Sequence, residues 1–383
     1  MFYFGIEHEV AFFNKEGKFA DFSRTKFADF NQIVERLPTY PSDYPQLRVG
    51  NAGIKQKRWY IEGFERFEDS ENVIECVPKG IEIRTTINST IQNAINELSE
   101  SFRLLCENAS SFGFSPVLIS FNPYYAVFKP QPPLNDYEIK WRQTSPERQT
   151  AHIPMLTYGP DLNISVSGLS AEGVIDIGKK LTYYSPYIVP FSYSSPFYQG
   201  TLWDGLSVRT FIRTGKRPAV MVFVEKREQL IDSVPSLTKI ARIPAEVGRI
   251  EFKAFDSCDD FTIYAGLLAL LKGLVLDQTL LGRATVPDGE KHQISAKEGF
   301  DNQDILAIAL QVLQASEIAL FNDPDVQLLA PLKVMLEKRE TPAHKLIQIF
   351  NRVGSIEEAL LQTYQSGLSK GERKKEERLQ FPF

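Results

Sequence analysis

Cysteine is scarce in this chain, and its few cysteines are not arranged as in a secreted disulfide scaffold. Cys76, Cys106 and Cys258 are widely spaced and odd in number, which predicts free thiols in a reducing compartment. The N-terminus lacks a basic segment and reaches a charged residue at Glu7, too early for a signal peptide. We therefore expect a cytoplasmic protein that is not exported.

Long hydrophobic runs and a surplus of positive charge are also absent. The most apolar stretch, residues 265–276, contains Lys272 and is flanked by Asp260 and Asp277, so it is too short and too charged to span a bilayer. The 43 basic and 48 acidic residues give a net charge of −5, which provides no attraction for a polyanion such as nucleic acid. Membranes and nucleic acids are therefore not the expected partners.

What is present is the composition of an ordinary globular protein, with 43% hydrophobic, 24% charged and 12% aromatic residues. The length of 383 residues exceeds the size at which a single core usually stops growing. We predict one domain over residues 1–369, helical in its last third over residues 261–369, and a charged tail over residues 370–383. A homodimer is left open.

Local patterns divide the chain into a strand-rich first part and a helical last third. Strands are predicted where apolar and polar residues alternate, over residues 2–13, 73–77, 81–86, 162–166, 206–212, 219–224 and 249–255. Helices are predicted from three- and four-residue apolar spacing, over residues 89–113, 171–184, 263–281, 304–321, 327–337, 343–350 and 356–364. This order favours an α+β fold with helices packed on one face of a mainly antiparallel sheet.

Two of these segments depend on turn signals. Residues 73–86 are interpreted as a hairpin around the turn Pro78-Lys79-Gly80. Residues 38–67 mix proline, glycine and basic residues without a clear period, so we interpret them as an irregular excursion that could cover a substrate.

The first predicted strand carries two carboxylates on one face. Residues i and i+2 of a strand share a side, so Glu7 and Glu9 project together. Like charges this close raise each other's pKa unless a cation lies between them, and Mg²⁺ prefers carboxylate oxygens. A solvated sheet face is the alternative from this strand alone. His8, on the other side, is better explained as a packed or hydrogen-bonded histidine than as a ligand.

Later predicted strands repeat the alternation of charged and apolar residues. Glu251 lies between Arg249 and Lys253 on one strand face, and Glu82 lies between two isoleucines. A sheet face that repeatedly carries carboxylates and amides is expected to hold metal and phosphate. Surface alternation would explain any one of these strands, so the prediction depends on the whole set.

Polar and basic residues continue this pattern in the middle of the chain. Asp161 and Asn163 alternate with apolar residues, and the alternation over residues 207–213 places Arg209 and Arg213 on one face. Guanidinium groups can hold a carboxylate or phosphate through two hydrogen bonds. Two surface arginines in ion pairs are the alternative.

Several of these segments form an ordered set. The opening strand Gly5-Ile6-Glu7-His8-Glu9 has the pattern G-[IVT]-E-x-E. It is followed along the chain by Ser195-Pro196-Phe197 with Gly200, then Ser207-x-Arg209, then Arg249-Ile250-Glu251-Phe252-Lys253. In order and approximate spacing, these segments resemble the glutamate–cysteine ligase superfamily, the carboxylate-amine ligases related in fold to glutamine synthetase. The resemblance covers residues 2–260, and its specificity lies in the order of the set.

The resemblance implies a fold and a site. The implied fold is a curved, mainly antiparallel sheet with helices on its outer face, as in glutamine synthetase and guanido kinase catalytic domains. The implied metal ligands are Glu7, Glu9, Glu75, Glu82 and Glu251, and the implied catalytic residues are Arg209, Lys253 and Glu9. The implied nucleotide-binding residues are Lys253, Arg213 and Asn163, with Asp161 as an alternative to Asn163, and the implied substrate-binding residues are Arg209 and Ser207. Lysine at 253, where arginine is common, and the lack of histidine in Asp161-Leu162-Asn163 are departures from the family pattern.

The implied chemistry uses ATP and Mg²⁺. The γ-phosphoryl group of ATP is transferred to a substrate carboxylate, and an amine attacks the resulting acyl phosphate. Neither a G-x-x-x-x-G-K-[ST] loop nor a G-x-G-x-x-G fingerprint occurs, so metals on the sheet are expected to hold the nucleotide. Glutamate and cysteine are the expected substrates, as in glutathione biosynthesis. The alternatives are a different amine, or a degenerate ligase fold that only binds or regulates.

Overall fold

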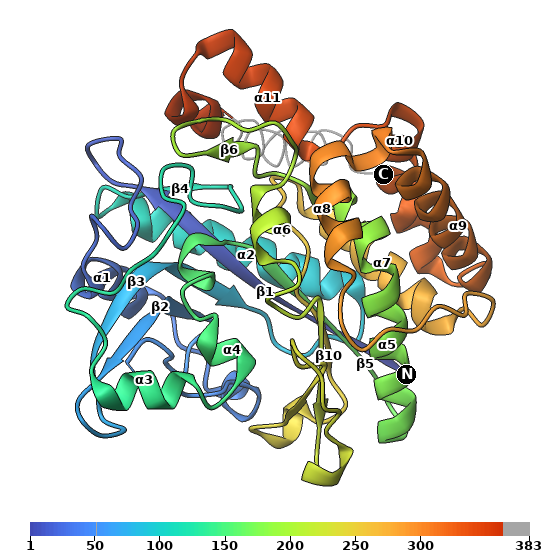
Figure 1. The fold of residues 1–383 in the computed structure, drawn as a ribbon, viewed down its shortest axis with the longest axis horizontal. Helices are drawn as coiled ribbons and strands as arrows, with labels where there is room; N and C mark the ends of the chain where they lie inside the picture. The colour runs from blue at the N-terminus through green and yellow to red at the C-terminus, as the bar shows by residue number, and fades with distance from the viewer. Residues whose placement is uncertain (51, 363–383) are drawn as a thin grey trace, which may run out of the picture.

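A computed structural model describes residues 1–50 and 52–362 of the chain, and its core is a curved sheet with helices packed against it (Figure 1). The strands are β1 Phe2–Phe13, β2 Trp59–Phe67, β3 Val73–Arg84, β4 Ser115–Val117, β5 Pro160–Val166, β6 Phe197–Tyr198, β7 Thr201–Leu202, β8 Val220–Val224, β9 Thr238–Ile240 and β10 Ile250–Phe252. The main sheet has the order β2-β3-β1-β5-β10-β8-β9, with β4 paired to the end of β1. Apart from the parallel β8–β9 pair, its pairings are antiparallel. This confirms the predicted α+β architecture.

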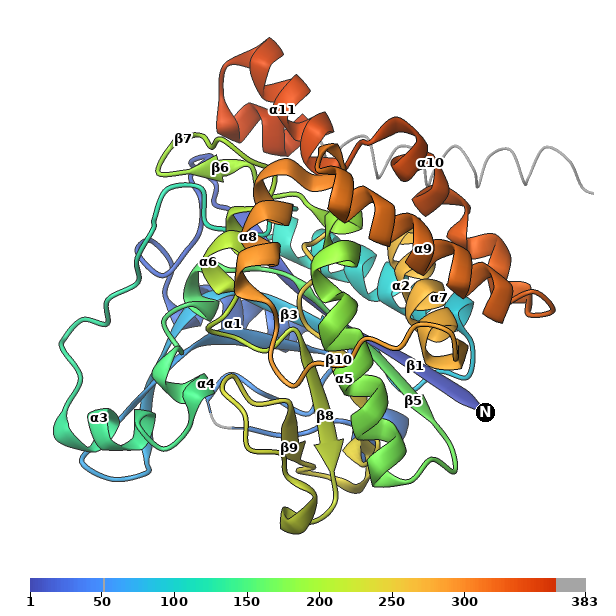
Figure 2. The same ribbon diagram turned by 45° about the vertical axis from the view of Figure 1, so that its right-hand side comes forward.

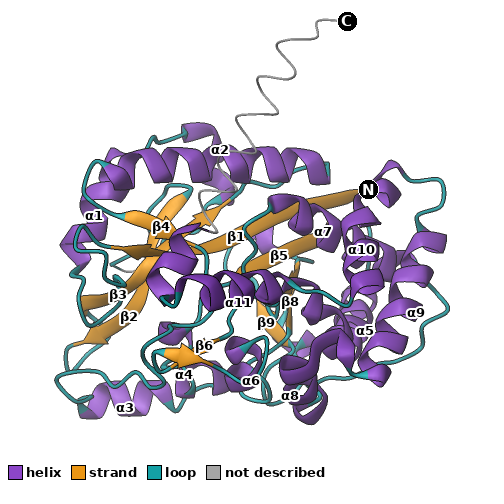
Figure 3. Cartoon of the chain, turned by 90° about the horizontal axis from the view of Figure 1, so that it is seen from above, coloured by secondary structure: helices purple, strands orange, loops and turns teal. Residues whose placement is uncertain are grey.

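Helices cover one face of this sheet. The helices of the described residues are α1 Phe27–Arg36, α2 Ile91–Ser110, α3 Asp136–Arg142, α4 Pro146–Gln149, α5 Ala171–Ile188, α6 Val208–Arg213, α7 Phe261–Leu276, α8 Gly289–Glu298, α9 Gln303–Ala319, α10 Ala330–Lys338 and α11 Pro342–Val353. Helix α2 contacts β1 and β4, and Figure 3 shows it lying along them, while α7 contacts β5 and α5 contacts β8 and β10. Helices α9 and α10 pack on the outside of α7 (Figure 2). Within the described residues, no helix combines the length and the apolar character needed to cross a bilayer.

Strand β1 separates the apolar core from the polar face of the sheet. Ile6, His8 and Val10 are at most 1% exposed and belong to the side that packs against the helices. Glu7 and Glu9 project from the opposite side and remain partly exposed. Because apolar and acidic residues alternate along β1, Glu7 and Glu9 lie on the opposite face of the sheet from the one that packs against the helices.

His8 is packed in the core, as its position on the strand predicts. Its Nδ1 lies 3.2 Å from the hydroxyl of Tyr264, and its ring makes edge contacts with Phe102 and Phe261. Complete burial lowers the pKa of His8 to about 3. The imidazole is therefore neutral and on the far side of β1 from the acids.

The predicted hairpin at residues 73–86 is wrong, because β3 continues through the expected turn. Gly80 is needed for a close strand approach and not for a reversal: an added Cβ would lie 2.4 Å from the carbonyl oxygen of Val10. Lys79 is an extra residue in the ladder, since the pairing with β2 steps from Gly80 directly to Pro78. Such a bulge redirects a side chain without ending the strand.

Two further predictions are corrected. Residues 38–67 are not wholly irregular, because β2 lies at their end and pairs along β3. Residues 206–212 are not a strand: the hydroxyl of Ser207 accepts a hydrogen bond of 3.0 Å from the backbone nitrogen of Thr210 and caps helix α6. Serine is a preferred N-cap residue, and this local bond outweighs the β-branched residues that follow it.

The remaining elements agree with the predictions to differing degrees. Strands β1, β5 and β8 and helices α2, α5, α9 and α11 confirm their predicted segments, whereas β10 is shorter than expected and α7 ends at Leu276. Helices α1, α3, α4 and α8 were not predicted. The predicted helix at 356–364 is described as helical only through residue 362. The charged tail at 370–383 lies outside the described residues.

Candidate active site

A cavity of about 460 Å³ lies over the polar face of the sheet. Its floor is formed by β1, β2, β3, β5 and β10, and its lining includes segments near residues 46–54, 141–154 and 209–218. The acids predicted from strand alternation, together with Glu62, form two groups here. We call them the Glu7 cluster (Glu7, Asp161, Glu251) and the Glu9 cluster (Glu9, Glu62, Glu82).

The Glu7 cluster joins three neighbouring strands. Glu7 on β1 is opposite Asp161 on β5, and Glu251 on β10 is opposite the next polar residue of β5, Asn163. One carboxylate oxygen from each of the three acids lies within 4.8 Å of the others. The register of the sheet, more than any loop, therefore sets the spacing of these acids.

Two basic residues neutralise much of the Glu7 cluster. Arg249 lies 3.1 Å from Glu7 and 3.5 Å from Glu251. Lys253 lies 3.1 Å from Glu251 and contacts Asp161 directly. All three acids of this cluster therefore have a cationic partner.

Burial and these contacts shift the pKa values of Glu251 and Asp161 in opposite directions. Burial would raise the pKa of Glu251, but Lys253 and Arg249 outweigh it and lower that pKa to about 2. Burial dominates at Asp161 and raises its pKa to about 7, with Lys253 opposing the shift and Glu251 adding to it. A bound cation would therefore favour the charged form of Asp161.

The Glu9 cluster lies on β1, β2 and β3. Glu9 is opposite Glu82 in register, and Glu62 on β2 is opposite Gly80 of β3. Glu82 is only 3% exposed, and burial followed by the charges of Glu62, Glu7 and Glu9 raises its pKa well above the ordinary range. Among the described residues, neither Glu62 nor Glu82 has an ion-pair partner within 4 Å.

The donor set fits a divalent cation. Mg²⁺ takes carboxylate and amide oxygens, and each cluster offers three carboxylates in mutual reach. In the described structure, the buried Oδ1 atom of Asn163, beside the Glu7 cluster, also lacks a hydrogen-bond partner. Glu82 in the other cluster has like charges around it and no ion-pair partner within 4 Å in the described part of the chain, which is the arrangement that a metal ion relieves.

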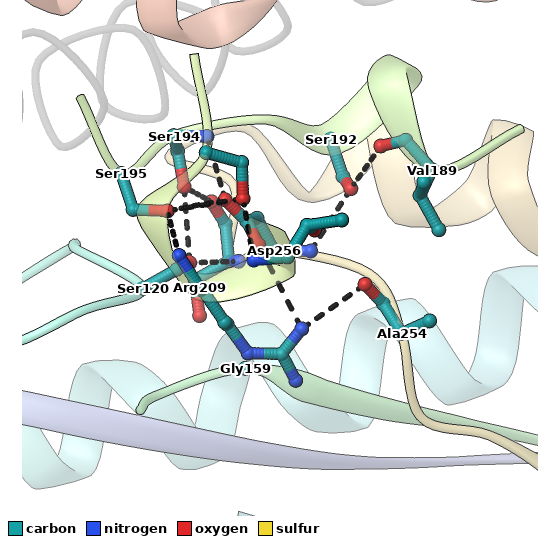
Figure 4. A network of polar contacts seen from close by, with 12 residues as sticks. Ser120, Gly159, Val189, Ser192, Ser194, Ser195, Arg209, Ala254 and Asp256 are labelled. Atoms are coloured by element: carbon teal, nitrogen blue, oxygen red, sulfur yellow. Dashed lines mark hydrogen bonds and ion pairs between the residues drawn. The ribbon is translucent and has the colours of Figure 1, made fainter. Parts of the chain in front are cut away.

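Arg209 lies at the edge of the cavity, but its guanidinium is engaged by the backbone (Figure 4). Nη1 donates to the carbonyl of Ala254 and Nη2 to that of Lys253, each at 3.0 Å. Its position depends on Gly159, because an added Cβ there would lie 2.4 Å from Nη2. Arg209 therefore supports the backbone at Lys253.

A buried polar network behind the cavity holds Arg209. Asp256 lies 3.7 Å from its Nη1 and accepts hydrogen bonds from the backbone nitrogen of Ser194 at 3.0 Å and from the hydroxyl of Ser195 at 2.7 Å (Figure 4). Ser207 belongs to this layer as well, since its hydroxyl caps α6 and lies 3.3 Å from that of Ser195. The segments around Ser195 and Ser207 thus act as support for Arg209.

Arg213 and Arg217 form a basic end of the cavity. Within the described residues, the side chain of Arg213 makes no hydrogen bond or ion pair, although it is only 8% exposed. Burial, and then the charges of Arg209 and Arg217, lower its pKa well below the ordinary range. Arg217 donates 2.7 Å to the carbonyl of Glu147. An anionic ligand would relieve this concentration of positive charge.

A second group of basic residues lines the cavity beyond the Glu7 cluster. Arg48, Lys239 and Arg242 contribute to the lining there, and Arg242 pairs with Glu246. The guanidinium of Arg249 lies 4.2 Å from the ring centroid of Phe223, which also lines the cavity. The acidic floor therefore runs between two basic ends.

The structure brings most of the sequence-predicted site residues together. Those that line the cavity are Glu7, Glu9, Glu82, Glu251, Asp161, Asn163, Lys253, Arg209 and Arg213. Ser207 is fully buried behind it as a helix cap, so its predicted contact with substrate is not supported. Glu75 is exposed near the start of β3, seven residues from Glu82. At about 3.3 Å per residue this separation is too long for the two acids to share a cation.

The site also contains residues that sequence reasoning missed. Glu62 was assigned to an irregular segment, although the aromatic and apolar run of residues 59–67 is typical of a strand. The turn signal at residues 78–80 predicts a turn at Lys79, and Arg217 lies between two predicted strands. The three cysteines are free, as predicted, and Cys76 lines the cavity with its pKa raised by burial to about 12.

Comparison with known proteins finds a related sequence. No protein-family model matches the chain. The chain is 28% identical over 156 residues to a protein of Jannaschia sp. (strain CCS1) named "Putative glutamate--cysteine ligase 2". The match covers 38% of this chain and 38% of that relative. The sequence likeness therefore extends over less than half of either protein.

Solved structures share the fold over most of this chain. A bifunctional glutathione synthetase from Pasteurella multocida matches with a TM-score of 0.59 at 11% identity, over 96% of this chain and 52% of that protein. Glutamate–cysteine ligase of Francisella tularensis, in complex with AMP, matches with a TM-score of 0.57 at 12% identity, over 96% and 88%. The ligase PafA, in complex with the ubiquitin-like protein Pup, matches with a TM-score of 0.50 at 11% identity, over 92% and 68%. The present chain spans about half the length of the first of these.

Proposed function

From its carboxylate-amine ligase fold, we propose that this chain is an ATP- and Mg²⁺-dependent enzyme that forms an amide between a carboxylate and an amine. The γ-carboxylate of glutamate and the amine of cysteine are the substrates we propose first. The observation that carries this proposal is the cavity floor, where two clusters of three carboxylates lie between two basic ends. Such a floor suits a reaction in which two anions must approach each other.

The residues of the cavity divide into binding regions. Arg213 and Arg217 bind the carboxylate of the acid substrate, because Arg213 has no partner within the described protein. Arg48, Lys239 and Arg242 receive the phosphates of the nucleotide at the other end. The reacting groups then meet above the acids. Guanidinium and ammonium groups suit these roles because they pair with carboxylate and phosphate oxygens.

The proposed reaction has two steps. A carboxylate oxygen attacks the γ-phosphorus of ATP, the bond to ADP breaks, and an acyl phosphate forms. The amine nitrogen then attacks the acyl carbon, inorganic phosphate leaves, and the nitrogen loses a proton. The Glu7 and Glu9 clusters would hold Mg²⁺, which would neutralise charge at the phosphoryl oxygens. Lys253, between Asp161 and Glu251, is positioned to meet the transferred group.

Two alternatives follow from particular features. The first is an amine substrate other than cysteine, which is suggested by the lysine at position 253 and by the acids Glu62 and Glu65 in the lining of the cavity. A binding protein without turnover is the alternative from another class. Because the cavity keeps both acid clusters, both basic ends and the buried support of Arg209, we favour the enzyme.

An ADP-release assay tests the proposal. Purified protein is incubated with Mg²⁺, ATP and glutamate, and ADP is measured with cysteine and with a panel of other amines. Release that depends on both glutamate and cysteine, with the dipeptide identified by mass, is the expected result. Release with another amine would change the substrate and keep the chemistry. If Mg²⁺ and ATP bind but no amine or acid gives ADP, the binding-protein alternative is supported.

A further inference from the structure

Lys79 is a buried lysine that contacts one of the cavity acids. It is 1% exposed, and its Nζ donates 2.6 Å to Oε1 of Glu9, 2.9 Å to the carbonyl of Pro154 and 2.8 Å to the carbonyl of Thr157. An ammonium group has three N–H donors, so every donor of Lys79 is used. The hydroxyl of Tyr158 in turn donates 3.0 Å to the carbonyl of Lys79.

The carboxylate of Glu9 is fixed from both sides. Oε1 accepts the hydrogen bond from Lys79, and Oε2 accepts one of 2.9 Å from the backbone nitrogen of Gly159. Gly159 is also the glycine against which the guanidinium of Arg209 packs. The side chain of Glu9 is thus held in place by hydrogen bonds from Lys79 of β3 and from the segment at residues 154–159.

Lys79 is also a resident positive charge in direct contact with the Glu9 cluster. Glu62 and Glu82 have no ion-pair partner within 4 Å among the described residues. Within these residues, the ammonium group of Lys79 is therefore the one cation that forms an ion pair with the Glu9 cluster. A fixed positive charge beside a cation site lowers the affinity for the cation, because like charges repel strongly where water is excluded. The bulge in β3 is what directs Lys79 to this position.

We propose that Lys79 is a positioning residue that holds Glu9 in its working orientation and, as a resident counter-charge, weakens the binding of a free divalent cation to the Glu9 cluster. This inference rests on the proposed function, since it assigns Lys79 a role in a cation site. It implies that the Glu9 cluster gains its metal together with the nucleotide, whose phosphates supply negative charge. Removing Lys79 should therefore change cation binding and turnover in opposite directions.

Mn²⁺ binding by the full-length chain, measured by electron paramagnetic resonance without nucleotide, tests this. For Lys79→Met we expect Mn²⁺ binding tighter by about tenfold or more and a kcat for ADP release lower by about tenfold or more. Lys79→Gln keeps hydrogen-bond donors for the two carbonyls while removing the charge. It should show the same tighter Mn²⁺ binding with a smaller loss of thermal stability.

Lys180 provides a matched control. It is 2% exposed and donates 2.6 Å to the carbonyl and 2.8 Å to the carboxylate of Asp277, away from the cavity. Lys180→Met should lower the melting temperature and leave the Mn²⁺ affinity of the folded protein unchanged. Unchanged or weaker Mn²⁺ binding in both Lys79 variants would overturn the role of Lys79. A wild-type chain that binds no Mn²⁺ and releases no ADP would instead overturn the proposed function, and the role of Lys79 with it.

Discussion

Arg249 and Glu7, 242 positions apart in the chain, form an ion pair of 3.1 Å that reaches over β5, the strand between β10 and β1. Arg249 also lies 3.5 Å from Glu251, so one guanidinium is shared by two acids of the Glu7 cluster. Side chains therefore join β1 to β10 across β5 on the cavity side, in addition to the backbone hydrogen bonds. A test of the acids must separate this structural contribution from an effect on turnover.

Substitutions of Glu62 and Glu75 can be compared for this purpose, because the two acids lie on the paired strands β2 and β3. Glu62 lies in the cavity, whereas Glu75 is exposed outside it. Glu62→Gln removes one carboxylate from the Glu9 cluster, and we expect the rate of ADP release to fall by about a hundredfold or more. Glu75→Gln changes an exposed acid outside the cavity and should leave the rate within about twofold. Steady-state kinetics in saturating Mg²⁺ compare the two. A large loss in Glu75→Gln with normal Glu62→Gln would reverse the assignment.

Arg213→Met should weaken substrate binding without destabilising the fold. The variant removes a buried charge that Arg209 and Arg217 repel and that no described residue pairs with. We expect the KM for the acid substrate to rise by about tenfold or more, while the melting temperature stays the same or increases. Arg103→Met, which removes two exposed ion pairs on α2, serves as the control and should alter neither value. A lower melting temperature with normal KM would make Arg213 a structural residue.

Arg209→Lys distinguishes support from direct substrate contact. A lysine cannot replace both hydrogen bonds to the carbonyls of Lys253 and Ala254, and we expect a loss of about 2 kcal/mol in the free energy of unfolding. The misplaced Lys253 should lower kcat more than it raises KM. Chemical denaturation and steady-state kinetics measure both effects. A large rise in the KM for the acid at unchanged stability is what direct contact with substrate, as expected from the sequence, would produce.

The burial of His8 as a neutral imidazole predicts that the fold loses stability in acid. Its pKa falls from the ordinary value of 6.5 to about 3 through burial, so below pH 6.5 the unfolded chain binds a proton that the folded chain does not. Stability is therefore lost as the pH falls from about 6.5 toward 3, by about 2 kcal/mol at pH 5 from this residue. His8→Leu should flatten the dependence of the melting temperature on pH between 7 and 4. The slope should not vanish, because burial also lowers the pKa of His292, to about 4. An unchanged slope would contradict the assignment.

The sequence predicted the parts of the site that depend on strand alternation. Glu7, Glu9 and Glu251 could be placed on one face because each lies in a short run where apolar and charged residues alternate. The pattern also separated His8 from its acidic neighbours. Their partners across the sheet could not be derived in this way, since register is set by pairing between distant segments.

The errors have local physical causes. Gly80 after a proline and a lysine resembles a turn, but its small size serves the close approach of β3 to β1. Ser207 precedes a β-branched and aromatic run, yet its hydroxyl caps a helix. Glu62 was missed because glycine and arginine interrupt the pattern of β2, and Glu75 was included because its distance from Glu82 depends on how far β3 extends.

The alternation of β1 also has a consequence for how the sheet assembles. A slip of one residue against β3 or β5 would turn Glu7 and Glu9 toward the helices and expose Ile6, His8 and Val10. Inserting unpaired carboxylates among apolar side chains is strongly unfavourable, so such a pairing would not persist. The acids that serve the proposed chemistry thus also favour the correct register of β1, because misaligned pairings would bury their charges.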